Sequence, residues 1–233
     1  MYKTSIYMQT ENGNFDWENY FSPESREKLF KKLDFHQVFS RLREHLKEDK
    51  FRLAFALNRV MTRLLVGKAP HHPRVLELGA ATGFLARWLL RRYGGTGTLV
   101  DSSKASYHAY GLIEDEVKEN ITYLNVDLFT LELQERFDLV CSFGLIEHFI
   151  DKAPVLEIHK KYVTANGMII ILVPLDTPLT RAFLEVHPEL NLGYRELLTE
   201  KEFKLILSRH RFQVTRTQIS KGYVYDFIGA VCR

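Results

Sequence analysis

The sequence predicts an α/β protein built on a mostly parallel β-sheet of seven strands. From residue 74 onward, short apolar runs with strand character alternate with stretches of helical periodicity. The runs are apolar throughout, which is typical of a parallel sheet that helices cover on both faces. Two β-like runs at the end follow each other directly and are joined at Lys221-Gly222, which predicts an antiparallel hairpin that closes the sheet.

The individual elements follow from local patterns. The strands are predicted at residues 74–78, 99–100, 121–126, 139–141, 168–173, 212–219 and 223–232. The helices of this region are predicted at residues 84–93, 103–116, 153–162 and 199–209. Thr199 and Glu202 have the spacing of a capping box, which favours a helix start at that point.

Residues 1–73 are predicted to form a helical cap or lid on the domain of residues 74–233. Ser22-Pro23 and Asp34 are helix-start signals, because Ser and Asp cap helices and Pro is tolerated at the first helical position. A third helix is predicted over residues 51–66, where apolar residues recur at helical spacing.

Composition and charge exclude several classes of protein. The 233 residues are 45% hydrophobic and 26% charged, which is typical of a globular domain and not of a disordered chain or a fibre. No apolar run approaches the roughly 18–20 residues of a membrane span, and the start has no signal-peptide pattern. Cys141 and Cys232 are too few for a disulfide framework, so we expect a cytoplasmic protein. The net charge of +3 disfavours a nucleic-acid partner, although residues 1–73 carry 13 basic and 9 acidic groups.

The most informative segment is Val75-Leu-Glu-Leu-Gly-Ala-Ala-Thr-Gly-Phe84. It reads as a buried strand that enters a glycine-containing turn and then a helix. Gly79 permits a tight turn, and Gly83 lets the helix pack closely. The start of that helix offers free N–H donors to an anionic group. Such turns also bind dinucleotides and phosphates or serve structure alone, so this segment leaves the ligand open.

Acidic and polar residues end the strands that follow. Asp101 ends the second strand, 22 residues after Gly79, and Asp127 ends the third. The fourth strand, residues 137–142, continues into Phe143-Gly-Leu-Ile-Glu-His-Phe149. The carboxyl ends of parallel strands meet at the edge where open α/β sheets bind ligands. The sequence therefore predicts a nucleoside-type site there, with an acid suited to ribose hydroxyls.

With these motifs the sequence resembles the class I S-adenosylmethionine-dependent methyltransferases, and within them the branch that methylates quinones, phenols and other small metabolites. The resemblance covers residues 74–173 by motif and reaches residue 233 by element order. It rests on VLELGAATG, FDLVCSFGLIEHF and GMIIILVP. It implies a Rossmann-like fold with a reversed terminal strand, S-adenosyl-L-methionine as cofactor and S-adenosyl-L-homocysteine as product.

The resemblance also implies roles for single residues. It places Glu77 near the methionine amino group, Asp101 on the ribose hydroxyls, and Asp127 with Leu128 beside the adenine. The residues expected at the cofactor are Glu77, Gly79, Ala80, Thr82, Gly83, Asp101, Ser102, Asp127, Leu128, Ser142, Phe143 and Tyr20. Ala81 stands where the family has its middle glycine, and its methyl group fits if φ stays negative.

The sequence differs from some related methyltransferases, and it also disfavours two other classes of enzyme. Residues 142–145 lack the Asn/Asp-Pro-Pro-Tyr/Phe signature of amino-directed nucleic-acid methyltransferases. Gly144 stands where some related quinone enzymes have a metal-binding Glu, and Glu147 with His148 alone is a poor site for a hard cation, so no metal is expected. The acids at the strand ends and the final hairpin disfavour a dinucleotide oxidoreductase, and the acids of an aminopropyl transferase are not found.

His148 is the candidate catalytic base, because its ordinary pKa lies near neutrality and its loop follows the fourth strand. The structural alternative is that His148 caps the next helix or bonds a backbone carbonyl. His187 and His36 are further candidates for the same role.

The acceptor pocket is expected from two variable segments. One is the long loop of residues 175–198, since loops of this length are uncommon unless functional. The other is an amino-terminal segment rich in aromatic residues that pack the cap or close over the cofactor. These residues are Tyr7, Phe15, Trp17, Tyr20 and Phe21, of which Tyr7 and Tyr20 are the lid candidates.

The function predicted is methyl transfer to an oxygen or nitrogen of a small organic acceptor, with oxygen favoured because His148 offers a base. The alternatives are an enzyme that methylates RNA or protein and a cofactor-binding partner subunit without catalysis. The sequence does not identify the acceptor, the target atom, the pathway or the oligomeric state.

Overall fold

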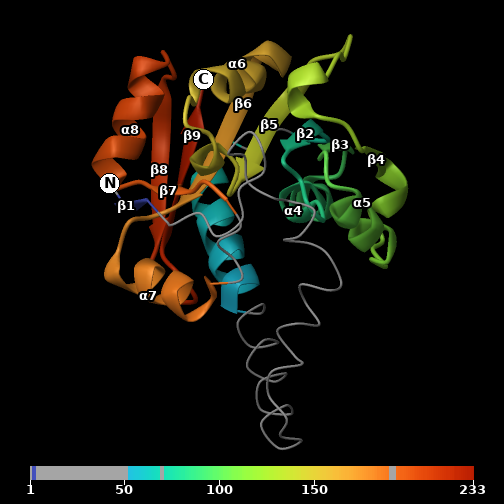
Figure 1. Ribbon diagram of the computed structural model, residues 1–233. Helices are drawn as coiled ribbons and strands as arrows, with labels where there is room; N and C mark the ends of the chain where they lie inside the picture. Colours follow the sequence, from blue (N-terminus) through green and yellow to red (C-terminus); the bar gives the residue numbers. More distant parts are fainter. Residues whose placement is uncertain (1, 4–51, 69–70, 189–192) are drawn as a thin grey trace, which may run out of the picture.

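The computed structural model describes residues 2–3, 52–68, 71–188 and 193–233, and within them it confirms the mostly parallel seven-stranded sheet (Figure 1). The strand order is β4-β3-β2-β5-β6-β9-β8. β9 runs antiparallel to both of its neighbours, and the other pairs are parallel. The strands are β2 (Arg74–Leu78), β3 (Thr96–Val100), β4 (Ile121–Leu124), β5 (Phe137–Phe143), β6 (Val163–Pro174), β8 (Val214–Ser220) and β9 (Phe227–Cys232). The reversed final strand is therefore present as expected.

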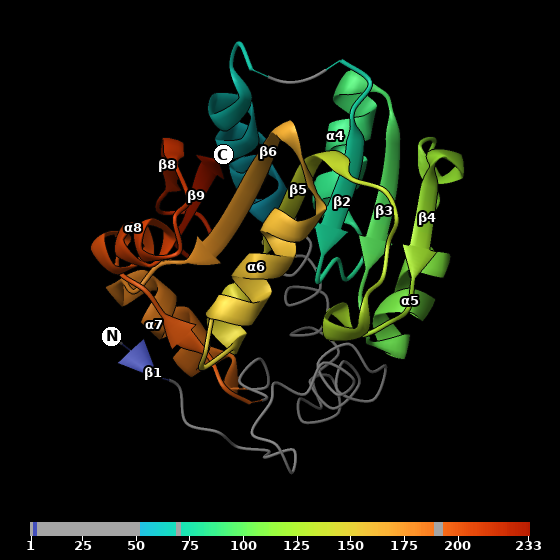
Figure 2. The same ribbon diagram turned by 90° about the horizontal axis from the view of Figure 1, so that it is seen from above.

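Helices cover both faces of the sheet (Figure 2). The helices are residues 52–65, α4 (Phe84–Tyr93), α5 (Lys104–Gly111), α6 (Ala153–Tyr162), α7 (Pro178–Val186) and α8 (Glu200–Arg209). The short 3₁₀ helices that the structure describes include η1 (Lys118–Asn120), η2 (Leu128–Thr130) and η3 (Ile146–His148). The helix of residues 52–65 packs with α4 and α5 in one hydrophobic cluster, whereas α6 and α8 pack in the cluster of the other face. A two-stranded antiparallel pair, β1 (Tyr2–Lys3) with β7 (Glu196–Leu197), lies apart from the main sheet.

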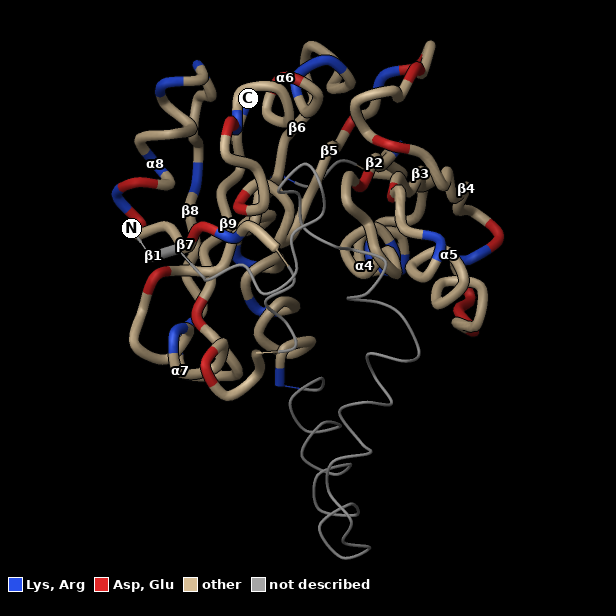
Figure 3. Tube along the Cα trace, in the orientation of Figure 1, with Lys and Arg blue, Asp and Glu red and all other residues tan. Residues whose placement is uncertain are grey.

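The central strands carry the core. β6 is buried from Gly167 to Val173, and Figure 3 shows no charged position along it. Its long apolar run, GMIIILV, is the pattern expected of a strand that helices cover on both sides. No helix in the described ranges is long and apolar enough to cross a membrane.

One helix boundary differs from the sequence prediction, and one helix was not predicted. The helix predicted to reach residue 116 ends at Gly111, because Asp115 pairs with Arg87 and Arg91 of α4 and accepts the N–H of Val117, which holds the following segment in a turn. α7 lies inside the segment interpreted as a loop. Its start signal is present in the sequence, since Thr177 caps the helix and Pro178 occupies its first turn.

The helix of residues 52–65 belongs to the core of the sheet domain. Its buried positions include Met61, Leu64 and Leu65. Gly229 of β9 makes room for this helix, because a Cβ added there would lie 2.8 Å from Leu64 Cδ1. The division into residues 1–73 and 74–233 stays a prediction, and its first 51 residues, other than Tyr2 and Lys3, lie outside the described ranges.

We expect Leu64→Ala to lower the free energy of unfolding by about 2–5 kcal/mol, because it leaves a cavity between the helix and β9. The matched control is Val66→Ala, just past the same helix, where the side chain is 60% exposed and the expected change is within about 0.5 kcal/mol. Urea denaturation of the whole chain measures both values. Equal losses in the two variants would show that the helix does not pack on the sheet.

Candidate functional site

A cavity of about 250 Å³ lies at the carboxyl edge of the parallel strands. Its lining comes from the connections that follow β2, β3, β4 and β5. The lining residues are Gly79, Val100, Asp101, Ser102, Val126, Asp127, Leu128, Phe129, Leu145, His148 and Phe149. The strand ends that the sequence singled out therefore meet around one space, as the parallel topology requires.

Six of the predicted site residues line this cavity, namely Gly79, Asp101, Ser102, Asp127, Leu128 and His148. The apolar walls were missed by the sequence analysis. Val126, Phe129, Leu145 and Phe149 each lie within two residues of a predicted residue or motif, and that adjacency was the signal available.

The turn after β2 has three residues with positive φ: Gly79 at 61°, Ala81 at 47° and Gly83 at 70°. A Cβ on Gly79 would lie 2.7 Å from Leu145 Cδ1, and one on Gly83 would lie 2.4 Å from Leu99 Cδ1. The turn thus needs glycine at both positions, for its conformation and for its close packing.

The condition under which the methyl group of Ala81 was expected to fit, a negative φ, is not met, because φ is 47°. Two hydrogen bonds hold Ala81 in the left-handed region: its N–H donates to Asp101 Oδ2 at 2.8 Å, and its carbonyl accepts the Tyr123 hydroxyl at 2.9 Å. These bonds offset a backbone cost of about 1–2 kcal/mol for a residue that has a Cβ.

Glu77 is buried beneath the turn, outside the lining of the cavity. Its carboxylate accepts the N–H groups of Leu85 at 3.3 Å and Ala86 at 2.7 Å, so it caps the first turn of α4. Burial raises its pKa to about 7, because desolvation outweighs these two hydrogen bonds and the nearby charge of Arg87.

Asp101 ties the end of β3 to the turn after β2. Its Oδ1 accepts the Ser103 N–H at 2.9 Å, and its Oδ2 accepts the Ala81 N–H. Asn125 donates to the backbone carbonyl of Asp101 at 2.8 Å, which adds the loop after β4 to the same unit. Asp101 is buried and yet lines the cavity, so its carboxylate is held in place before any ligand enters.

Asp127 and Leu128 open η2 on the far wall. The Asp127 side chain accepts the N–H of Phe129 at 2.8 Å and is exposed. The Phe129 ring lies edge-on to that of Phe149, with centroids 5.5 Å apart. This side of the cavity therefore combines an exposed carboxylate with apolar and aromatic surface.

His148 is buried in η3, and the expected bond to a backbone carbonyl is present, from Nδ1 to the Tyr194 carbonyl at 2.9 Å. A carbonyl oxygen only accepts, so Nδ1 carries the proton and Nε2 carries the lone pair of the neutral ring. Burial lowers the pKa of His148 well below its ordinary value, and the nearby Arg195 and Lys152 lower it further. Its Nε2 lies 3.8 Å from Oε1 of Glu147, whose pKa burial raises to about 7.

Several predicted residues face elsewhere. Ser142 is buried and bonds His159 Nε2 at 2.9 Å, which ties β5 to α6. The Phe143 ring packs 5.5 Å from the Phe227 ring, and His187 packs against Phe183 of α7. Ala80, Thr82 and Gly83 belong to the turn without lining the cavity. The predicted Tyr7, Phe15, Trp17, Tyr20, Phe21 and His36 lie outside the described residues.

Comparisons with known proteins agree with this geometry. Residues 45–217 match a family model described as a methyltransferase domain. The chain is 29% identical over 98 residues to a ubiquinone biosynthesis O-methyltransferase of Bradyrhizobium diazoefficiens, covering 42% of this chain and 38% of that protein. It is 30% identical over 108 residues to a malonyl-[acyl-carrier protein] O-methyltransferase of Magnetococcus marinus, covering 46% and 40%. The matched stretch thus spans about two fifths of each curated relative.

Solved structures show the same fold. Magnesium protoporphyrin IX methyltransferase from Synechocystis, with bound S-adenosylhomocysteine, superposes with a TM-score of 0.62 at 15% identity, covering 89% of this chain and 99% of that one. Human N-acetylserotonin methyltransferase in complex with S-adenosylmethionine gives a TM-score of 0.54 at 25% identity, covering 68% and 47%.

The buried Glu77 predicts a pH-dependent stability. Its folded-state pKa of about 7 exceeds the ordinary 4.5, so its contribution is fully present below pH 4.5 and is lost as the pH rises through 7. The parent should therefore lose stability as the pH rises, and Glu77→Gln should not. The free energy of unfolding of the variant minus that of the parent should increase by about 3 kcal/mol from pH 4.5 to pH 8, measured by denaturation across that range. The lowered pKa values of His148 and His159 change stability with pH in the opposite direction. Both residues are present in the parent and in the variant, so their effects cancel in this difference.

The matched control is Glu132→Gln, an exposed glutamate, whose difference from the parent should stay flat over the same pH range. A flat difference for Glu77→Gln as well would contradict the raised pKa.

Proposed function

Because the chain belongs to the methyltransferase-domain family, we propose that it transfers the methyl group of S-adenosylmethionine to an oxygen or nitrogen of a small organic acceptor. The observation that carries this proposal is the single cavity in which Asp101, Asp127 and His148 meet at the carboxyl edge. Both curated relatives are named O-methyltransferases, which favours oxygen as the target atom.

The residues present fit the cofactor. Asp101 brings carboxylate oxygens to the cavity wall, and such oxygens are acceptors of the kind that ribose hydroxyl donors need. Asp127 and Leu128 are proposed to hold the adenine, because the wall they form has both polar and aromatic surface. Gly79 has no side chain, so it presents only backbone to the cavity.

Other residues near the ends of β2 and β3 are proposed to contact the same ligand. We propose that Ala80, Thr82, Gly83 and Ser102 contribute backbone and hydroxyl groups around the cofactor. Glu77 fixes the start of α4 relative to β2 through the two hydrogen bonds that its carboxylate accepts, so it serves as a positioning residue. Its contact with the methionine amino group of the cofactor stays a prediction. Ser142, Phe143 and Tyr20 stay predictions as cofactor contacts.

When bound, the cofactor supplies an activated methyl group on a sulfonium. The protein has to align the acceptor, exclude water and remove a proton from a weak nucleophile. We propose His148 for the last task, since the ring is neutral and its lone pair is on Nε2. Glu147, 3.8 Å from Nε2, is placed to stabilise the imidazolium that forms.

The cofactor assignment predicts a ligand-dependent shift in melting temperature. Saturation with S-adenosylhomocysteine at about 100 Kd adds roughly 2.7 kcal/mol to the free energy of unfolding, or about 5–10 °C for a chain of this size. We expect Asp101→Asn to lose most of this shift, because its amide presents a donor where the ribose needs an acceptor. The control is Asp151→Asn, an exposed acid beside η3, which should keep it. Equal shifts in the three proteins would refute the ribose assignment.

The acceptor class is tested with labelled S-adenosylmethionine and a lysate of the source cells, separated into small-molecule and macromolecular fractions. We expect label in the small molecules. Label in RNA or protein would replace this proposal with the macromolecule-directed alternative, and cofactor binding without any transfer would favour a non-catalytic partner subunit.

With the labelled acceptor in hand, His148→Gln should lower kcat by about 10²–10⁴ while keeping the S-adenosylhomocysteine shift. In the parent, a fall in kcat as the pH drops through about 7 should reflect protonation of Glu147 and not of His148, because burial holds the pKa of His148 well below its ordinary value. The control is His108→Gln, an exposed histidine of α5. A near-normal kcat in His148→Gln would refute the role of His148 as a base and favour a structural role through bonds such as the one to Tyr194.

A further inference from the structure

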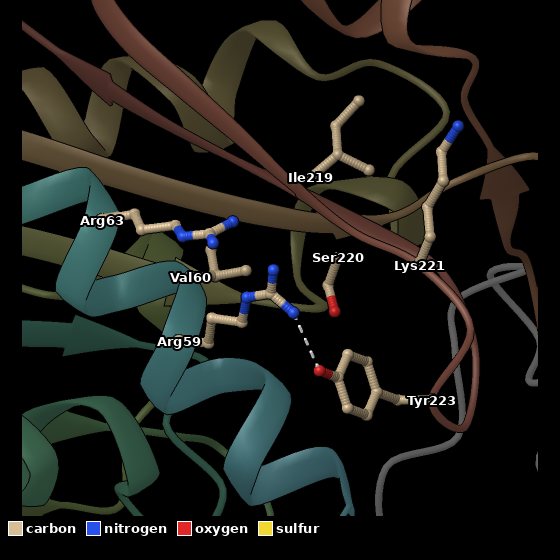
Figure 4. Close-up of a pocket in the computed structure, with 7 residues that line it drawn as sticks. All are labelled: Arg59, Val60, Arg63, Ile219, Ser220, Lys221 and Tyr223. Carbon is tan, nitrogen blue, oxygen red and sulfur yellow. Dashed lines mark hydrogen bonds between the residues drawn. The ribbon is translucent and has the colours of Figure 1, made fainter.

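A second cavity, of about 240 Å³, lies between the helix of residues 52–65 and the β8–β9 hairpin (Figure 4). We call it the basic hollow. It is lined by Arg59, Val60, Arg63, Ile219, Ser220, Lys221 and Tyr223. Three of these seven side chains are cationic and none is acidic. Within the described part of the chain, no carboxylate forms an ion pair with any of the three.

The basic hollow is separate from the cofactor cavity. Ser220 at the end of β8 pairs with Phe227, which in turn pairs with Pro174 at the end of β6, so both cavities lie toward the carboxyl edge. In the sheet order, however, β8 lies four strand steps from β2. At about 4.8 Å per step this is roughly 19 Å, too far for the hollow to be part of the space around Asp101.

The two arginines are held on one face of the helix. Arg59 and Arg63 are four residues apart, so they are neighbours on the helix surface. Arg59 Nη1 donates to the Tyr223 hydroxyl at 3.1 Å, and Figure 4 shows both guanidinium groups on the side of the helix that faces the hairpin. Lys221 lies on the hairpin with its ammonium group turned away from them.

The hollow is held by contacts on both of its sides. Arg216 of β8 donates to the carbonyls of Arg63, Leu64 and Val66, which fixes the end of the helix to the edge strand. The Phe55 ring packs 5.9 Å from the Tyr223 ring. The spacing between the helix and the hairpin is therefore set before any ligand arrives.

Ser220 and Tyr223 bring hydroxyl groups to the wall of the hollow. Ser220 is only 5% exposed and lines the hollow, and within the described residues its hydroxyl forms no hydrogen bond. The Tyr223 hydroxyl, which accepts from Arg59, has its own proton available to donate.

We propose that the basic hollow binds a phosphate group, either free phosphate or a phosphate monoester on a larger molecule. Arg59 and Arg63 supply the charge and the paired N–H donors, and Ser220 and Tyr223 supply hydroxyl donors. Two like charges at this helical spacing repel each other, and a dianion bound between them adds two attractive interactions that offset this repulsion. The oxygens of one phosphate are enough to engage all four side chains.

The test is calorimetric titration at constant ionic strength with inorganic phosphate and, separately, with ribose 5-phosphate. We expect Arg59→Gln and Arg63→Gln each to raise the Kd at least tenfold. The control is Arg209→Gln, an exposed arginine of α8 that removes the same charge outside the hollow and should change the Kd less than twofold. Tighter binding of inorganic phosphate identifies a free-anion site, and tighter binding of the monoester identifies an anchor for a larger ligand.

Equal binding of both probes by the parent, both hollow variants and the control would overturn the proposal, as would the absence of binding to the parent. Binding of single-stranded RNA without binding of either small phosphate would also overturn it. The hollow variants should keep the S-adenosylhomocysteine shift, so failure here is distinguishable from failure of the proposed methyl transfer.

Discussion

The carboxylate of Asp101 holds the site together. Its two oxygens accept N–H groups from Ala81 and Ser103, so one side chain fixes the turn after β2 and the start of the connection after β3. The left-handed Ala81 depends on this bond, because an alanine adopts that conformation only where its surroundings compensate for the cost. The same carboxylate lines the cavity, which means that the group that shapes the turn also forms part of the cavity wall.

Buried charge is the second constraint on this edge of the sheet. Glu77 beneath the turn and Glu147 beside His148 are both buried, and burial raises the pKa of each to about 7. Lys152 and Glu196 form a buried ion pair near the same connection. Groups held this far from their ordinary pKa cluster at functional sites more often than in structural cores. The edge therefore carries an electrostatic cost that the hydrophobic clusters on the two faces of the sheet have to offset.

Much of this architecture was predictable because apolar strands and glycine turns are local signals. The strand ends at Asp101 and Asp127 could be assigned to one site, since parallel topology forces them to one edge. Three features could not be derived in this way. The positive φ of Ala81 depends on Asp101 and Tyr123, which are distant in sequence, and the engagement of Ser142 by His159 depends on how α6 packs. The apolar wall formed by Phe129 and Phe149 requires two loops to meet.

The basic hollow shows why cations that are far apart in the sequence are hard to assign to one site. In the sequence, Arg59 and Arg63 lie on the helix predicted over residues 51–66, and Ser220 follows the strand predicted over residues 212–219. They become one cluster only because the helix packs against β9 and the hairpin, through Leu64 and the space left by Gly229. The contact that makes the helix part of the core also places its cations over the β8–β9 turn. The helix of residues 52–65 thus adds cationic side chains to the carboxyl side of the sheet, at a site separate from the cavity that Asp101 lines.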